Sequence, residues 1–506
     1  MSEKIAIITI DTYSAKLVVA ESKKLETFAI IDKEIEQIKL NLEQEDHFLK
    51  KPQIDTCINV LKNFRKLCEM YNVKKTIAIA NFDEQSRPKN LYSFFDEVFA
   101  TCGFRFELLT PEQRNNYIYS GVINTCDMPK GAIASLTAHS VSLIEYNRRN
   151  ILHSNLLDFG PINLLRMYPI ATHGAPVAFA KMEKYVETQL SDIDWIGVVD
   201  PEFAFIGSGE YFTDLAKMVR KLNKYPLDRD DQLVVKALDA SKIYLQLKTM
   251  DISSDKKLKG IEEPRADIFV AALAIICGII KASKRETITI TSRGINEGLL
   301  FPDFVPSTQE KPISDVVGFG IANNLVDLDD FDYAHSENVY NLSLLLFKQL
   351  RVLHKLPRGY VKVLRIASIL HDVGKRINYI GYEKYSYDVI LGLDIFGADH
   401  RELVLASFVA ALHGGADLQL AEWIKYKDLL TEEDLDAVKK LGCIVALAAN
   451  FDRTKSGLIV DINCDILGDS VIMKTISVGD SDYLIHKALG CGKEFEKNFH
   501  KKLEIL

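Results

Sequence analysis

The chain has 506 residues, of which 47% are apolar, and a formal net charge of −8. This length exceeds what one hydrophobic core supports, so we expect two to four domains. The acidic balance excludes a general nucleic-acid or membrane-surface protein, but it allows a local basic groove for a polyanion. The sequence has no run of 18 apolar residues, no signal-peptide pattern and no CxxC pair among its eight cysteines. It therefore predicts a cytoplasmic protein with reduced cysteines and no membrane span.

The first stretch, Lys4–Glu21, predicts a strand, a tight polar turn and a return strand. The run Ile5–Ile10 is apolar nearly throughout, which is typical of a strand covered on both faces. Asp11 and Ser14 place a carboxylate and a hydroxyl where the chain reverses. These groups could hold a phosphate or its metal ion. Alternatively, they form an ordinary hairpin turn, in which Asp and Ser are common.

Strands and helices then alternate, and a set of three strands occurs twice. After the first hairpin we expect strands over Glu26–Ile31, Lys75–Ala80 and Phe104–Leu109, and helices over Glu43–Tyr71, Leu91–Cys102 and Thr110–Gly121. The second set of strands covers Gly131–Leu136, Ser140–Asn147 and Asn150–Leu157. It is followed by helices over Gly160–Tyr168, Pro176–Gln189, Asp230–Gln246 and Ile268–Ala282, by strand segments at Trp195–Val199, Phe203–Ile206 and Thr287–Thr291, and by a glycine turn into a helix over Gly207–Leu222. This repetition indicates a duplicated α/β architecture, and clefts between such halves commonly hold ligands.

The pattern changes at Lys311–Pro312. Helical periodicity dominates from Val316 to about Phe451, and short strands are expected near Gly457–Ile462 and Val471–Ser477, before a basic amphipathic closing segment over Phe495–Leu506. We therefore predict domains over residues 1–123, 124–308, 309–457 and 458–506.

Three stretches together carry a resemblance to a known family. They are Leu108–Glu112 with Tyr119–Val122, Gly260–Ile261 with Arg265–Ile268, and Gly294–Leu300. With them the chain resembles the exopolyphosphatase/guanosine pentaphosphate phosphatase (Ppx/GppA) family over essentially its whole length. The resemblance implies an α/β core of two actin/Hsp70/sugar-kinase-like (ribonuclease H-like) domains, a helical HD-type domain and a small mixed α/β segment. It also implies removal of terminal phosphate from polyphosphate or guanosine pentaphosphate with Mg²⁺ or Mn²⁺, by a homodimer.

The residues that should carry this chemistry depart from the family pattern. In the first phosphate loop, Asp11, Ser14 and Lys16 match the family's Asp, Ser and Arg, but Tyr13 replaces a glycine that lets backbone amides approach a phosphate. In the second motif, Arg87 is a possible substitute for the arginine that contacts the anionic substrate.

Two further motifs have changed more. Arg114 lies where the family has a glutamate that activates water, and arginine cannot act as a base at neutral pH. The glycine cradle of the family's strongest motif is replaced by Ser135–Leu143, which keeps only Ser140 of its polar core. A later glycine turn at Gly207 and Gly209 is partly kept, although the following Glu210 adds a negative charge.

The resemblance thus gives Asp11 as the candidate catalytic residue. The candidate phosphate-binding residues are Ser14, Lys16, Arg87, Ser140, Gly207 and Gly209. Losing both the carboxylates and the glycine cradle would lower the rate by orders of magnitude, so we interpret the chain as a degenerate member with weak or lost activity. The alternatives are an active phosphatase of the family type and a non-catalytic polyanion- or nucleotide-binding regulatory protein on the same scaffold.

The helical half contains an HD-type pattern. His335 and the pair His371–Asp372 resemble the HD-domain ligands, and the usual last aspartate is replaced by Ala449, although Asp452 is close by. Imidazole and carboxylate suit a divalent first-row ion, so His335, His371, Asp372 and Asp452 are candidate metal ligands and a metal-dependent phosphohydrolase is a further hypothesis. Alternatively, His371 and Asp372 pair with each other and with helix ends and fix the bundle.

Overall fold

The computed structural model describes residues 3–38, 40, 48–82, 87–147, 149–197, 200, 203–249, 263–326, 328, 331–414 and 420–506, with backbone only at 171, 249, 263–267 and 420. These residues form two compact units, Met1–Val326 and Asp327–Leu506. Within the described ranges no helix is both long and apolar enough to cross a membrane. Gly260 and Ile261 of the family motif lie outside the described residues, as do the side chains of Arg265 and Asp267.

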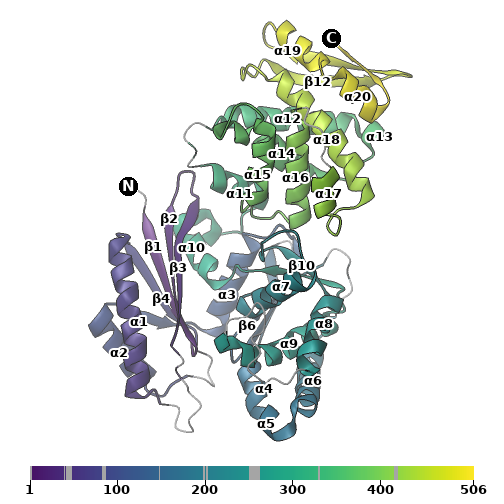
Figure 1. Ribbon diagram of the computed structural model, residues 1–506. Coiled ribbons are helices and arrows are strands. Elements are labelled where there is room, and N and C mark those ends of the chain that lie inside the picture. The colour runs from purple at the N-terminus through teal and green to yellow at the C-terminus, as the bar shows by residue number, and fades with distance from the viewer. Residues whose placement is uncertain are drawn as a thin grey trace. The chain divides into compact units, whose positions relative to one another are not determined.

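Unit 1 begins with a lobe built on a five-stranded sheet in the order β3-β2-β1-β4-β5. The strands are β1 (Lys4–Ile10), β2 (Ser14–Ser22), β3 (Phe28–Gln37), β4 (Lys75–Ala80) and β5 (Phe106–Leu108). The apolar run of β1 places it in the middle, antiparallel to β2 and parallel to β4. Helices α1 (Lys51–Met70) and α2 (Leu91–Cys102) cover one face of the sheet (Figure 1). Gly103 ends α2 in the left-handed conformation, at φ 74°.

The second lobe repeats this arrangement in a six-stranded sheet of order β10-β11-β9-β6-β7-β8. The strands are β6 (Lys130–Leu136), β7 (Val141–Asn147), β8 (Asn150–Leu157), β9 (Ala204–Ser208), β10 (Leu233–Lys236) and β11 (Thr287–Thr291). The helices are α4 (Pro161–Met167), α5 (Ile170–His173), α6 (Ala175–Ser191), α7 (Glu210–Leu222), α8 (Ala237–Thr249) and α9 (Glu263–Ser283). The central strand β6 is antiparallel to β7 and parallel to β9, as β1 is to β2 and β4. The predicted duplication is confirmed.

Three predicted segments of unit 1 were wrong in part. The helix expected over Asp230–Gln246 is the strand β10 followed by α8, because Leu233–Lys236 pairs antiparallel with β11 and buries alternate side chains. Trp195 lies in a turn instead of a strand. The first helix starts at Lys51, with a proline in its first turn where proline is tolerated.

Two glycines let the helices that follow the lobes pack backbone to backbone. Helix α3 (Pro111–Ile123) begins after β5, and Thr110 caps it by accepting a hydrogen bond from the Gln113 amide at 3.2 Å. Helix α10 (Ile295–Phe304) begins after β11. A Cβ on Gly121 would lie 2.0 Å from the Gly294 carbonyl oxygen, and one on Gly298 would lie 2.0 Å from that of Tyr117. Two of the three stretches that carry the family resemblance therefore meet at this helix contact.

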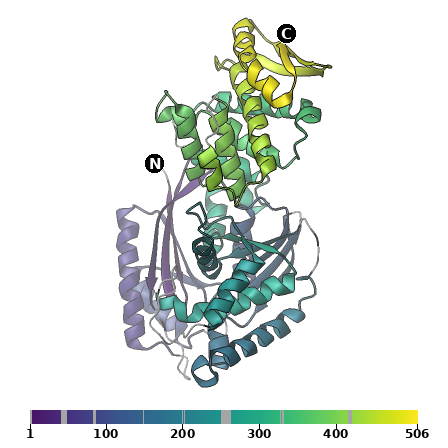
Figure 2. The ribbon, with the colours of Figure 1, turned by 45° about the vertical axis from the view of Figure 1, so that its right-hand side comes forward.

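Unit 1 closes with η2 (Pro306–Gln309) and α11 (Val316–Leu325). Unit 2 is a helical bundle of α12 (Tyr333–Gln349), α13 (Arg351–His354), α14 (Tyr360–Leu370), η3 (Val373–Arg376), α15 (Tyr382–Gly392), α16 (His400–Leu412), α17 (Leu420–Lys425) and α18 (Glu432–Phe451). A sheet of order β12-β13-β14 follows (Figure 2). It contains β12 (Ile459–Ile466), β13 (Ser470–Ser477) and β14 (Lys502–Ile505), with α19 (Asp482–Leu489) and α20 (Gly492–Phe499) before β14. The closing segment is therefore the end of a helix plus a strand.

We expect Gly298→Ala to destabilise unit 1, because the added methyl group would overlap the carbonyl of Tyr117, a backbone atom. Overpacking of this kind typically lowers the free energy of unfolding by about 1–3 kcal/mol. Urea unfolding of the full chain measures the change. Gly492→Ala is the matched control, because a Cβ there meets no atom within 4 Å. Equal midpoints for Gly298→Ala and wild type would contradict the packing role.

Candidate functional site

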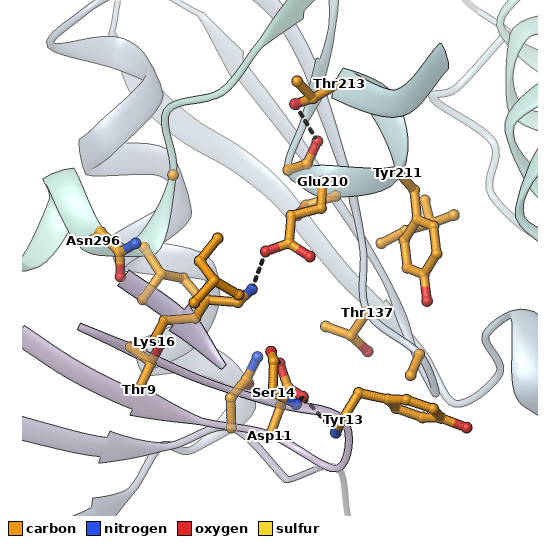
Figure 3. Close-up of a pocket in the computed structure, with 18 of the residues that line it drawn as sticks. Thr9, Asp11, Tyr13, Ser14, Lys16, Thr137, Glu210, Tyr211, Thr213 and Asn296 are labelled. Atoms are coloured by element: carbon orange, nitrogen blue, oxygen red, sulfur yellow. Dashed lines mark hydrogen bonds and ion pairs between the residues drawn. The ribbon is translucent and has the colours of Figure 1, made fainter. Parts of the chain in front are cut away.

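A cavity of about 390 Å³ lies in unit 1 and is lined by both lobes (Figure 3). Its walls are the β1–β2 turn, the β6–β7 turn, the start of α7 and the turn before α10. The two hairpin turns occupy equivalent places in the two sheets, one after each central strand. The duplicated fold thus presents the same kind of turn to the cavity from two sides.

The first of these turns, Asp11–Ser14, is closed by its own aspartate. The Oδ1 atom of Asp11 accepts hydrogen bonds from the backbone amides of Tyr13, at 2.7 Å, and Ser14, at 2.8 Å. Its Oδ2 atom accepts a bond from the Ser14 hydroxyl at 3.0 Å, and the amide of Asp11 donates to the carbonyl of Ser14 at 2.9 Å. The amides that could face a phosphate here already have a carboxylate acceptor.

The second turn, Thr137–Ser140, repeats this arrangement with a neutral acceptor. The Oγ1 atom of Thr137 accepts bonds from the amides of His139, at 3.2 Å, and Ser140, at 2.9 Å. The amide of Thr137 donates to the carbonyl of Ser140 at 2.9 Å. Thr137 thus plays the part here that Asp11 plays in the first turn.

Arg114 supports the second turn from α3. Its side chain is 1% exposed, and Nη1 donates to the Ser140 hydroxyl at 3.1 Å. A guanidinium stays protonated at all physiological pH values. The position that the family resemblance assigns to a proton acceptor is therefore a buried cation that holds the turn.

An ion pair crosses the cavity between the two lobes. Lys16 of β2 contacts the carboxylate of Glu210, the first residue of α7, through Nζ and Oε1. Figure 3 shows Glu210 pointing from the start of the helix toward Lys16. Gly209, just before it, has a φ of 101°, a conformation that favours glycine.

The charged side chains that line the cavity balance one another. The described lining has the cations Lys16, Lys33, Lys217 and Arg293 and the anions Asp11, Glu210, Asp214 and Glu297. Several are close enough to pair, such as Lys217 with Asp214 at 3.5 Å. The lining therefore lacks the strong cationic excess that a long polyanion would favour.

The cavity carboxylates fit a dedicated Mg²⁺ site poorly. Mg²⁺ needs near-octahedral oxygen coordination from carboxylates with free lone pairs. Asp11 already accepts three hydrogen bonds, Glu210 is paired with Lys16 and Asp214 with Lys217. We derive no step through a metal ion in this cavity.

The structure brings only some of the predicted phosphate-binding residues together. Ser14, Lys16 and Gly209 line the cavity with Asp11. Ser140 is fully buried behind the second turn, bonded to Thr137 and Arg114.

Two other predicted residues lie elsewhere. Arg87 is exposed and is not among the described residues that line the cavity. Gly207 belongs to β9, where a Cβ would lie 2.2 Å from the ring of Phe212, so its small size serves packing. Sequence reasoning missed Thr137, and its place in the second copy of the duplicated hairpin could have identified it.

In unit 2, three of the four predicted metal ligands meet. Nitrogen or oxygen atoms of His335, His371 and Asp372 all lie within 4.8 Å of one another. The rings of His335 and His371 are 5.3 Å apart at their centroids, and both residues are buried. These residues come from α12 and from the end of α14.

Hydrogen bonds orient both imidazole rings toward this cluster. The Nδ1 atom of His371 lies 2.8 Å from the carbonyl of Ser368, to which it donates. The Nδ1 atom of His335 lies 2.8 Å from Oδ2 of Asp452. Asp452 therefore lies behind His335 as its carboxylate partner. Each ring can then offer Nε2 to the cluster, an arrangement common around histidines that bind metals.

The protonation of these groups suits a metal ion. Burial lowers the pKa of His371 well below its usual range, so its ring is neutral, the form that binds metals. Burial alone would raise the pKa of Asp452, but hydrogen bonds from His335 and the Gly457 amide outweigh it, so the net pKa is lowered. Two imidazoles and a carboxylate fit a divalent first-row ion, which would polarise a bound water or phosphoryl oxygen.

Two cationic or polar groups border the cluster. Lys375 lies 3.1 Å from Oδ2 of Asp372 and 4.6 Å from the centre of the Tyr382 ring. The ring of His413 is 5.0 Å from that of His371, and burial lowers the pKa of His413 to about 4. The cluster is thus enclosed by side chains that can also donate or accept hydrogen bonds.

The two related sheets with a cleft between them and the helical unit that follows define a two-lobed, actin-like α/β phosphatase fold with an added helical domain. The family model of the Ppx/GppA phosphatase family matches residues 18–305, and that of Ppx/GppA phosphatase domain III matches residues 321–493. The chain belongs to the Ppx/GppA phosphatase family. The predicted family and fold class are confirmed, whereas the HD-type label for the helical domain stays a prediction.

Individual relatives are distant. A guanosine-5'-triphosphate,3'-diphosphate pyrophosphatase of Aeromonas salmonicida is 25% identical over 142 residues, which is 28% of this chain and 28% of that protein. The Aquifex aeolicus Ppx/GppA family member has a TM-score of 0.53 at 22% identity and covers 61% of this chain and 99% of its own. An exopolyphosphatase from Cytophaga hutchinsonii has a TM-score of 0.54 at 18% identity and covers 60% of this chain and 98% of its own. These structures support the fold alone.

Proposed function

We propose that the cleft of unit 1 binds the phosphate groups of polyphosphate or guanosine pentaphosphate and that its phosphatase turnover is weak or lost. The observation that carries this proposal is the closure of both hairpin turns. Asp11 and Thr137 each take two backbone amides of their own turn. Amides with an internal acceptor are not available to stabilise a transferring phosphoryl group, and losing one such donor typically lowers the rate by about 10²–10³-fold.

Binding without turnover is supported by the side chains that remain. Lys16, Lys33 and Lys217 line the cavity, and a lysine ammonium can contact a phosphate as a point charge. Arg114 supplies positive charge beside the second turn and cannot deprotonate water. The cleft therefore keeps cations for phosphate recognition, while an arginine occupies the position that the family resemblance assigns to the base.

Phosphate release and ligand binding, measured side by side, test this proposal. We expect long-chain polyphosphate and guanosine pentaphosphate, with Mg²⁺ or Mn²⁺, to bind the full chain and to release no phosphate above background. Asp11→Asn should likewise release no phosphate above background, and it should stay folded, because asparagine Oδ1 can still accept the two amide bonds of the turn. If wild type releases phosphate and Asp11→Asn abolishes that release, the interpretation of the chain as a degenerate family member is refuted.

Lysine variants separate specific from general charge effects on binding. We expect Lys33→Met with Lys217→Met to weaken polyphosphate binding, because both residues line the cavity. Lys51→Met with Lys281→Met is the matched control, since it removes the same two charges from exposed pairs with Glu97 and Glu187 outside the cavity lining. An equal loss in the control and in the cavity variant would contradict recognition by the cleft.

As a second candidate function, the helical unit binds a divalent first-row metal ion through His335, His371 and Asp372, with Asp452 orienting His335. The specific observation is the meeting of the three ligand groups within 4.8 Å. Such an ion would allow hydrolysis of a phosphate ester or anhydride in this unit. The homodimer and the cytoplasmic location stay predictions from the sequence.

Metal content and thermal stability test the metal site. We expect about one ion per chain after purification without chelator, and a rise in melting temperature with Mn²⁺. His371→Ala should abolish both effects, and Asp452→Asn should weaken affinity by about 10–100-fold, as is typical for the partners of metal ligands. His486→Ala, at an exposed position of the same unit, is the control. Protein without stoichiometric metal and without stabilisation by Mn²⁺ would exclude the site.

A further inference from the structure

The ion pair between Lys16 and Glu210 engages the cation that the resemblance matches to the arginine of the phosphate loop. Both side chains line the cavity, and their side-chain exposed fractions are 18% and 39%. The pair joins β2 of the first lobe to α7 of the second. A partly exposed pair of this kind contributes little to stability, so a ligand can displace it.

The backbone fixes Glu210 at this place. Gly209 has a φ of 101°, and its carbonyl accepts bonds from the amide of Thr213, at 3.0 Å, and from the hydroxyl of Thr213, at 2.9 Å. Glu210 is therefore held at the first position of α7, where a negative charge is favourable. Its carboxylate takes one of the positions around the Lys16 ammonium from which a phosphate oxygen could contact it.

We infer that Glu210 is a specificity-determining residue of the cleft, because its carboxylate competes with ligand phosphates for Lys16. This inference rests on the proposed function, since it takes the cleft to be the phosphate-binding site. A ligand must replace one carboxylate contact and approach a cavity whose lining carries as many anions as cations. Simple inorganic polyanions are therefore bound less tightly than the cationic side chains alone would allow.

Binding of inorganic tripolyphosphate to the full chain, measured by calorimetry with chelator present, tests this inference. Glu210→Gln keeps the size of the side chain and removes its charge. We expect it to raise the affinity by about tenfold, as befits one unit charge near a protein surface, and to steepen the salt dependence. Glu187→Gln, which breaks an exposed pair with Lys281 at 2.9 Å outside the cavity lining, should leave the affinity unchanged.

The same substitution in a Lys16→Met background isolates the competition. In that background, Glu210→Gln should raise the tripolyphosphate affinity clearly less. No ammonium is freed there, and the substitution removes only the repulsion between the Glu210 carboxylate and the ligand. An equal gain in both backgrounds would overturn competition for Lys16. Unchanged or lower affinity on Glu210→Gln would overturn the inference altogether.

The experiment also separates this inference from the proposed function. Wild-type binding that Glu210→Gln does not change overturns the inference and leaves phosphate recognition intact. Folded wild-type and Glu210→Gln proteins that both fail to bind tripolyphosphate contradict phosphate recognition itself, and the inference with it. Circular dichroism of each variant shows that it is folded.

Discussion

A tight turn between two antiparallel strands leaves backbone N–H groups that need an acceptor. A bound phosphate can be that acceptor, or a side chain of the turn can. In this protein both turns that face the cavity use a side chain, Asp11 in the first lobe and Thr137 in the second. This choice sets the character of the cleft, because an amide that already donates a good hydrogen bond gains little from a ligand. Any phosphate recognition in this cleft would then depend on lysine and arginine side chains.

The framework around these turns obeys a different constraint from the turns themselves. Helices α3 and α10 approach so closely that Gly121 and Gly298 have no room for a Cβ. Any larger residue at either position would push helices α3 and α10 apart. The chemistry of the turns, by contrast, can change without moving the strands, since a self-capped turn keeps the same strand register. The helix contact therefore limits the size of two residues, whereas each turn requires only an atom that accepts its amide bonds.

The same distinction explains how much the sequence alone could predict. The apolar run of β1, the cap at Thr110 and the repeated three-strand pattern are local signals, and each gave the right element. The strand β10 was read as a helix because its four residues become a strand only by pairing with β11, a partner more than fifty residues away. In the site, Asp11, Ser14 and Lys16 followed from their order in one loop. The capping role of Thr137 is local to its own turn and could have been found by comparing the two copies of the hairpin. The contact of Lys16 with Glu210 depends on how distant segments meet, which no local pattern states.

The polar groups of the cleft in unit 1 and those of the metal-ligand cluster in unit 2 are partnered differently. In the cleft, opposite partners meet: carboxylate with amide, ammonium with carboxylate, guanidinium with hydroxyl. In the helical unit, the Nδ1 atoms of His371 and His335 are bonded to Ser368 and Asp452. The neutral ring of His371 leaves its other nitrogen as an acceptor, in a buried space that it shares with His335 and the Asp372 carboxylate. Acceptors gathered in this way repel one another unless protons or a cation lie between them, and burial disfavours protonation of His371. A metal ion would resolve that conflict, whereas in the cleft of unit 1 other protein groups pair with the charged side chains.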